Sequence, residues 1–337
     1  MKVAQISHPG GDFEVVEREL PSPKPNEVRI KVEACGICHS DMFVKEGHFP
    51  GITYPRVPGH EVVGIIDQVG SNVKGWKPGQ RVGVGWHGGH CFECDSCSRG
   101  KFNLCAKELI CGISYDGGYA EYMVAPQEAL ALVPEELNSV QAAPLLCAGI
   151  TTYNSLRHSP ALPGDRVAVQ GIGGLGHLAI QIAAKMGFHT IALSSGEDKR
   201  KLALSLGAKD YIDTSKGNPA QELQKLGGAK VILATAPNKK AIESIIDGLG
   251  TDGQLLIVAA PAESIEVSPI KLIMKRNTVS CWPSGHAKDS EDALNFCSIA
   301  NVAPMVEEYP LDKVNEAYKQ MISNKARFRV VLNMSKK

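Results

Sequence analysis

The chain has no net charge to attract a charged partner. Its 337 residues carry 36 Lys and Arg side chains against 36 Asp and Glu side chains. Balanced charge produces no long-range field that would draw in nucleic acid or an anionic membrane surface. The composition therefore excludes a non-specific polyanion binder.

Long hydrophobic runs are also missing. No apolar run approaches the ~18 residues that a membrane-spanning helix needs, and the opening segment MKVAQISHPGGDFEV lacks the apolar core of a signal peptide. There is no fixed-period repeat and no low-complexity tract, and 43% hydrophobic with 21% charged residues is typical of a soluble globular protein rather than a disordered or fibrous one. We therefore expect a cytoplasmic protein, and the length favours two domains.

Cysteine and glycine, in contrast, are abundant, with 10 and 34 residues. In a cytoplasmic chain of this size, clustered cysteines bind metal or take part in chemistry more often than they form disulfides. The glycines indicate many special turns and close approaches of the backbone.

Strand-like and helix-like segments alternate between residues 165 and 282. The strand candidates are continuous apolar runs, as expected when helices cover both faces of a sheet. The alternation predicts a doubly wound parallel sheet of six strands in an α/β fold. The six candidates are residues 166–170, 189–195, 211–214, 231–236, 255–260 and 278–282.

The first 150 residues have a different pattern, with short alternating apolar stretches separated by Pro and Gly clusters. This pattern predicts a mostly antiparallel β domain with long loops. After residue 285 we expect helices at 291–300 and from 312, and a closing strand at 327–332 that returns to the first domain or lies across the cleft. The predicted domains are therefore residues 1–150 with 285–337, and residues 151–284.

Four thiols in fifteen residues form the most specific local motif, Cys-x2-Cys-x2-Cys-x7-Cys. Four thiolates around one ion make the closed tetrahedral site of a structural zinc. The alternatives are four unrelated thiols, a zinc finger that reads nucleic acid, although no basic helix follows, or substitution of one thiol by His87 or His90. The predicted ligands are Cys91, Cys94, Cys97 and Cys105.

The glycine motif Gly171-x-Gly173-x-x-Gly176 follows an expected strand and opens an expected helix. In that context such glycines let the backbone approach a pyrophosphate at the helix N-terminus, so the motif predicts dinucleotide binding. The alternative is a Gly-rich turn without a ligand.

Several other polar residues have ordinary interpretations when taken one at a time. Cys35 and Cys38 could form a redox pair, His60 could be a satisfied loop histidine, and Cys147 could be a small buried apolar residue. Spacing alone assigns none of them a function.

Together, these motifs show a clear family resemblance. Over essentially its whole length the sequence resembles the zinc-dependent medium-chain alcohol dehydrogenases. The resemblance implies a GroES-like catalytic domain, a Rossmann cofactor domain and an active site in the cleft between them. The matching motifs are GICHSD at 36–41, PGHE at 58–61, the four cysteines at 91–105, DGGYAEY at 116–122, LLCAGIT at 145–151 and GIGGLGHLAIQ at 171–181.

The resemblance implies a catalytic zinc. Cys38, His60 and Cys147 match its ligands, and Glu61 matches a carboxylate that joins them transiently. Two thiolates neutralise the ion formally and leave one position open, where a substrate oxygen is polarised. Asp41 is expected to accept a hydrogen bond from the far nitrogen of His60.

The implied reaction is reversible oxidation of a primary or secondary alcohol to an aldehyde or ketone. The alcohol proton would leave through the Ser40 hydroxyl, and a hydride would pass to the nicotinamide ring. Trp86 and Phe49 match bulky positions of the substrate pocket, although a single aromatic residue is more commonly part of the core. The remaining implied cofactor contacts are His39, Thr151, Gly174, Leu175, Val258 and Arg329.

Phe43 departs from the family pattern. Many relatives carry a histidine there, which completes a proton path from the Ser/Thr hydroxyl and the cofactor ribose to solvent. A phenyl ring cannot relay protons, and His48 is close to it in the sequence.

A second departure concerns the nucleotide. Where users of NAD place an acidic residue at the end of the second Rossmann strand, this chain has Ser194 and Ser195. Two hydroxyls with the nearby cation Lys199 suit a 2′-phosphate, whereas Glu197 and Asp198 fit the first turn of the next helix. NADP is therefore the expected cofactor, with NAD as the alternative.

Only eleven residues separate Cys105 from Gly117, so an insertion seen in dimeric animal relatives is absent. The chain resembles the tetrameric microbial group, and we expect a homotetramer, with a homodimer as the alternative. The other functions considered are a zinc-free quinone or enone reductase of the same fold and a non-catalytic zinc protein.

Overall fold

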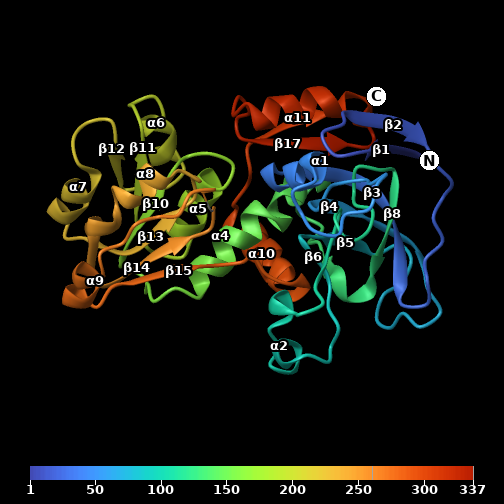
Figure 1. Cartoon of the computed structure of the whole chain (residues 1–337), viewed down its shortest axis with the longest axis horizontal. Helices are drawn as coiled ribbons and strands as arrows, with labels where there is room; N and C mark the ends of the chain where they lie inside the picture. Colours follow the sequence, from blue (N-terminus) through green and yellow to red (C-terminus); the bar gives the residue numbers. More distant parts are fainter. Residues whose placement is uncertain (260, 337) are drawn as a thin grey trace. The chain divides into compact units, whose positions relative to one another are not determined.

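The computed structural model describes residues 1–259 and 261–336, which form two compact units (Figure 1). One unit contains Met1–Ile150 and Gly285–Lys337, and the other contains Thr151–Ser284. Within the described ranges, no helix combines the length and apolar character needed to cross a bilayer. Residue 260, at the end of the expected strand 255–260, lies outside the described residues.

A mainly antiparallel sheet organises the first unit. Its strand order is β16-β17-β3-β4-β5-β9, with β8 also paired to β3, and only the β16–β17 pair is parallel. In β3 the alternate residues Val28, Ile30, Val32 and Ala34 are all buried, so the period-two pattern of the sequence is the core-facing side of this strand. The strands are β3 (Glu27–Ile37), β4 (Val62–Val69), β5 (Arg81–Val84), β8 (Tyr122–Pro126), β9 (Leu130–Leu132), β16 (Val306–Tyr309) and β17 (Arg329–Asn333).

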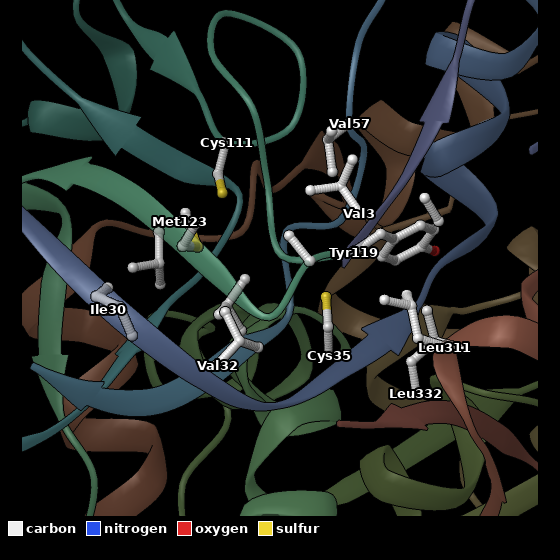
Figure 2. Close-up of a cluster of buried hydrophobic side chains, with 14 of the residues drawn as sticks. Val3, Ile30, Val32, Cys35, Val57, Cys111, Tyr119, Met123, Leu311 and Leu332 are labelled. Carbon is white, nitrogen blue, oxygen red and sulfur yellow. The ribbon is translucent and has the colours of Figure 1, made fainter. Parts of the chain in front are cut away.

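Shorter elements complete this unit. The hairpin of β1 and β2 packs on the same core, and β6 and β7 pair at the two ends of the cysteine-rich loop. Figure 2 shows part of the core, in which Cys35 lies among apolar side chains; it is fully buried. The bounds are β1 (Lys2–Ile6), β2 (Phe13–Glu17), α1 (Met42–Glu46), β6 (His87–Gly89), α2 (Asp95–Ser98), β7 (Leu109–Ile110) and α3 (Ser139–Ala142).

The C-terminal segment returns to the first unit. Strand β17 pairs antiparallel with β3. Of the two placements expected for the closing strand, the return to the first domain is therefore the one observed. Helix α10 (Ala287–Ala300) begins four residues before the expected start, because His286 and Asp289 form a capping box at its N-terminus. Helix α11 (Val314–Ile322) is the helix expected from residue 312, and its apolar side chains pack on the core of the first unit.

The second unit contains the predicted six-stranded parallel sheet. Its order, β12-β11-β10-β13-β14-β15, is that of a doubly wound dinucleotide-binding fold, with the switch point between β10 and β13. The strands are β10 (Arg166–Gln170), β11 (His189–Ser194), β12 (Asp210–Asp213), β13 (Ala229–Ala234), β14 (Leu249–Ile257) and β15 (Thr278–Cys281). The helices are α5 (Gly176–Lys185), α6 (Arg200–Ser205), α7 (Pro219–Lys225), α8 (Lys239–Glu243) and α9 (Pro269–Lys275), while α4 (Ala148–Arg157) contains the unit boundary.

Each glycine of the strand-to-helix turn has a distinct local role. Gly171 has φ +92°, a conformation that L side chains rarely adopt. A Cβ on Gly173 would meet nothing within 4 Å, whereas a Cβ on Gly176 would lie 1.9 Å from the carbonyl oxygen of Gly171. The three glycines therefore provide the turn, an open backbone face and close packing of helix on strand.

The substitution Gly176→Ala is expected to lower the free energy of unfolding by about 1–3 kcal/mol, because the new methyl group overlaps backbone that cannot move aside. Gly173→Ala is the matched control and should change it by less than about 0.5 kcal/mol. Urea titrations of both variants provide the measurement. Equal stability of the two variants would contradict this account of the turn.

Candidate functional site

Two thiols, an imidazole and a carboxylate from separate segments meet in the first unit. The ligand atoms of Cys38, His60, Glu61 and Cys147 all lie within 4.8 Å of one another. The two sulfur atoms are 3.7 Å apart. The structure therefore brings together all four residues that the family resemblance implied.

Local structure explains how these donors converge. Cys38 follows β3 and caps the short helix His39–Asp41, and Cys147 follows the short helix Ala143–Leu146. His60 and Glu61 immediately precede β4, the neighbour of β3 in the sheet. Pairing of β3 with β4 thus fixes the first two donor segments side by side.

The buried carboxylate of Asp41 orients two of the donors. One oxygen lies 3.1 Å from Nδ1 of His60, and the other accepts the backbone N–H of Cys38 at 2.8 Å. The His60 contact assigns the ring proton to Nδ1 and leaves a lone pair on Nε2. Among the described residues, this buried Nε2 has no hydrogen-bond partner.

A metal ion fits this donor set. The unpartnered Nε2 of His60 is a ready ligand, and the hydrogen bond with Cys147 holds the pKa of the Cys38 thiol well below its usual range despite burial. Two sulfurs and an imidazole are borderline-soft donors that zinc prefers. Three such ligands leave a fourth position open, as in catalytic zinc sites.

Glu61 is the fourth member of this donor group and is completely buried. One of its oxygens accepts from the Arg329 guanidinium, and the other has no partner among the described residues. Burial raises the pKa of Glu61 to about 7, with Arg329 opposing the rise. A Cβ on Gly36 would lie 1.8 Å from the second oxygen, so glycine at position 36 makes room for this carboxylate. Arg329, implied as a cofactor contact, is thus buried and paired within the first unit.

Aromatic residues border the same donors. The Trp86 ring meets His60 edge-on, with centroids 5.0 Å apart, and packs with Phe49 against Val44, Ile110 and Ile113. Phe49 also contacts Phe43 at 6.4 Å between ring centroids. Ser40 is half-buried, and His39 and His48 are exposed. The expected pocket aromatics therefore lie together, one of them directly against the His60 imidazole.

The four cysteines of the 91–105 loop form a second donor group. Their sulfur atoms lie within 4.8 Å of one another, with Cys105 at 3.5 Å from Cys91 and 3.9 Å from Cys94. Backbone N–H groups of Ala106 and Cys97 lower the pKa of Cys94 to about 6. This closed set of four thiols fits a structural zinc.

The two nearby histidines bond to each other, and the buried Nε2 of His90 has no hydrogen-bond partner among the described residues. His87 shares hydrogen bonds with Glu108 at 2.8 Å and with Nδ1 of His90 at 3.0 Å. The donor group found here contains four sulfurs and no imidazole, which favours the four-thiol set over substitution of one thiol by histidine. Cys35 is likewise removed from Cys38, since it packs in the core while Cys38 lies with Cys147.

In the second unit, the turn after β11 is held by the next strand. The N–H of Gly196 donates to Asp213 at 2.7 Å, and its carbonyl accepts from the Tyr211 hydroxyl at 2.5 Å. The expected nucleotide contacts Ser194 and Ser195 precede this glycine. The turn is therefore preformed by side chains of β12.

Charged residues around this turn are mutually paired. Glu197 bonds to Arg200 and to Lys216, and the hydrogen bond from Arg200 above all lowers the pKa of Glu197 to about 2. The ammonium group of Lys199 donates to the carbonyl of Ile172 at 2.9 Å, so this cation reaches the glycine turn. The other implied contacts are placed as follows: Gly174 in the glycine turn, Leu175 at the N-cap of α5, Val258 just after β14 and Thr151 buried in α4.

Sequence reasoning missed three polar residues that support these sites: Tyr119, Tyr211 and Asp213. Tyr119 donates to Asp41 at 2.7 Å across 78 positions in the chain. Its motif, DGGYAEY, was the available signal, but the sequence does not show which group the hydroxyl meets.

Comparisons with known proteins agree with this geometry. Residues 24–135 match the alcohol dehydrogenase GroES-like domain, and residues 174–298 match the zinc-binding dehydrogenase domain. The chain is 45% identical to alcohol dehydrogenase patD of Penicillium expansum, over 99% of this chain and 97% of that protein. It is 38% identical to an alcohol dehydrogenase of Geobacillus stearothermophilus, over 99% of both chains.

Two solved structures superpose on this chain over nearly its full length. The cinnamyl alcohol dehydrogenase SbCAD4 of Sorghum bicolor superposes with a TM-score of 0.90 at 30% identity, over 99% of this chain and 98% of that chain. CAD of Helicobacter pylori, solved with NADP(H), superposes with a TM-score of 0.88 at 29% identity, over 100% and 98%. Fold, donor groups and full-length identity together show that this chain is an oxidoreductase of the zinc-dependent medium-chain alcohol dehydrogenase family.

Proposed function

We propose that this alcohol dehydrogenase binds its catalytic zinc through Cys38, His60 and Cys147 and interconverts primary or secondary alcohols with aldehydes or ketones. The observation that carries this assignment is the unpartnered, buried Nε2 of His60 beside two convergent thiols. When bound, zinc polarises the substrate oxygen, and the nicotinamide cofactor exchanges the hydride.

We assign the remaining roles, which are orienting His60, transferring the alcohol proton and contacting the substrate, to residues of the first unit. Asp41 keeps His60 in the tautomer whose Nε2 faces the thiols. The hydroxyl of Ser40, two residues after Cys38, relays the alcohol proton: it accepts that proton and releases its own to solvent water. Phe43 takes no part in this transfer because its ring has no exchangeable proton. Trp86 and Phe49 supply the apolar wall against which the carbon part of a substrate packs.

A second zinc, held by the four cysteines of residues 91–105, has a structural role in this proposal. A closed four-thiolate set offers no open position for a substrate, and its binding energy contributes to folding. The chain would therefore hold two zinc ions with different functions.

Loss of a catalytic ligand is expected to separate activity from folding. His60→Ala and Cys147→Ala should lower kcat/KM by more than about 100-fold while the protein stays folded, since changes to residues that only hydrogen-bond a metal ligand already reach that size. Cys97→Ala should mainly lower thermal stability. Steady-state kinetics and thermal unfolding of all three variants supply the comparison. Wild-type kcat in His60→Ala would refute the ligand assignment.

We also propose NADP as the preferred cofactor, with NAD as the alternative. Ser194 and Ser195 offer hydroxyls where a carboxylate would repel a 2′-phosphate. Pairing of Glu197 with Arg200 and Lys216 supports this proposal, because it neutralises the nearest following carboxylate. Lys199 adds a cation close to the glycine turn.

Ser194→Asp is expected to shift the preference toward NAD, because the new carboxylate repels a phosphate and accepts hydrogen bonds from ribose hydroxyls. Ratios of kcat/KM for NADP and NAD provide the test, with Ser205→Asp, on the exposed side of α6, as a control for added charge. A tenfold preference of the wild-type enzyme for NAD, about 1.4 kcal/mol, would overturn the proposal.

A homotetramer is the proposed assembly, with a homodimer as the alternative. The apolar surface of α9 supports self-association: Ile270, Ile273 and Met274 are 62%, 71% and 76% exposed. The adjoining β15 is an edge strand of its sheet, and unpaired edges with apolar neighbours commonly pair with another chain.

Ile273→Glu is expected to produce smaller assemblies, because a charge on this apolar face would be costly to bury. Sedimentation at several concentrations gives the mass, and Leu162→Glu, at an isolated exposed leucine of the same unit, is the control. A wild-type mass of 36.1 kDa, that of one chain, would refute the assembly.

A cytoplasmic location completes the proposal. All ten cysteines of the chain are free of disulfides, and eight of them are proposed zinc ligands or lie buried in the first unit's core. Thiols in that number persist reduced in a reducing compartment.

A further inference from the structure

Tyr119 lies at the centre of the first unit's core and has a polar group with a specific partner. It is fully buried, and Figure 2 shows its ring among the apolar side chains of that core. Its backbone is fixed on both sides, because its N–H donates to Pro58 at 3.0 Å and its carbonyl accepts from Ala4 at 2.8 Å. The ring therefore has little freedom to move.

The hydroxyl of Tyr119 reaches the carboxylate that orients the zinc ligands. It donates to Asp41 Oδ2 at 2.7 Å, the same oxygen that accepts the backbone N–H of Cys38 at 2.8 Å. Burial, reinforced by the charge of Asp41, raises the pKa of Tyr119 well above its usual range, so the hydroxyl remains a donor. Hydrogen bonds to a buried charge are among the stronger ones in proteins.

The residue before His60 is shaped to accept this ring. Gly59 has φ +103°, and a Cβ there would lie 2.5 Å from Cδ1 of Tyr119. The ring thus packs directly on the backbone that carries the imidazole ligand. Together with the Tyr119–Pro58 hydrogen bond, these contacts close a loop from Tyr119 through Asp41 and His60 back to Tyr119.

We infer that Tyr119 is a positioning residue of the catalytic metal site, which fixes the Asp41 carboxylate and through it the His60 ring, and so slows loss of the metal. The inference rests on the proposed zinc ligands. The competing interpretation is that Tyr119 only fills the core, in which case removing its hydroxyl would not affect the metal.

Tyr119→Phe tests the inference because it keeps the ring and removes the one hydrogen bond. Zinc transfer to an excess of chelating dye is expected to show two phases in the wild-type enzyme. The faster phase is assigned to the open site of Cys38, His60 and Cys147, and the slower phase to the closed four-cysteine site. The variant should speed the faster phase about tenfold, within the range seen when residues that hydrogen-bond metal ligands are changed, and leave the slower phase unchanged. Tyr115→Phe is the matched control, because that hydroxyl, in the same loop, donates to the carbonyl of Gly88 at 3.0 Å; it should leave the faster phase unchanged.

A double-mutant cycle on the rate of zinc release then tests whether Tyr119 acts through Asp41. If Tyr119 acts through Asp41, adding Tyr119→Phe to Asp41→Asn should change the release rate by less than about twofold. An unchanged faster phase in Tyr119→Phe, or full additivity of the two substitutions, would overturn the inference. A faster phase that survives His60→Ala would instead show that the proposed zinc ligands are wrong. The inference would then be refuted as well, because it rests on those ligands.

Discussion

The geometry of the metal-binding unit depends on one buried carboxylate. Asp41 is 2% exposed and accepts hydrogen bonds from an imidazole, a backbone N–H and a phenol. A charge in that position would be strongly destabilised without partners, so its three donors and its place in the fold stabilise each other. The result is a His60 ring whose unpartnered nitrogen lies beside two thiols.

Glycine provides the space that these buried polar contacts require. Gly36 leaves room for the Glu61 carboxylate, Gly59 for the Tyr119 ring and Gly176 for the turn that precedes α5. In each case a Cβ would lie within 2.5 Å of another atom. The high glycine content of the sequence therefore reflects close approaches at both the metal-binding and the nucleotide-binding sites.

The parts of the structure set by local patterns could be predicted from sequence. Continuous apolar runs separated by helical segments predicted the six-stranded sheet, and cysteine spacing predicted the closed thiol group. Contacts that depend on distant segments could not be predicted in this way. The pairing of Arg329 with Glu61, the bond from Tyr119 to Asp41 and the reach of Lys199 to Ile172 join residues that only the folded chain brings together. Helix α10 begins early for a local reason that periodicity does not detect, since a histidine acts as its cap.

In the proposed function, an open metal site for chemistry and a closed metal site for structure coexist in one chain. Zinc content per chain, measured together with the rate of alcohol oxidation during graded chelation, tests this claim most directly. The account predicts two zinc ions in the freshly purified enzyme, and loss of all hydride transfer when the first is removed while the folded state persists. One zinc ion or none in fully active enzyme would contradict it.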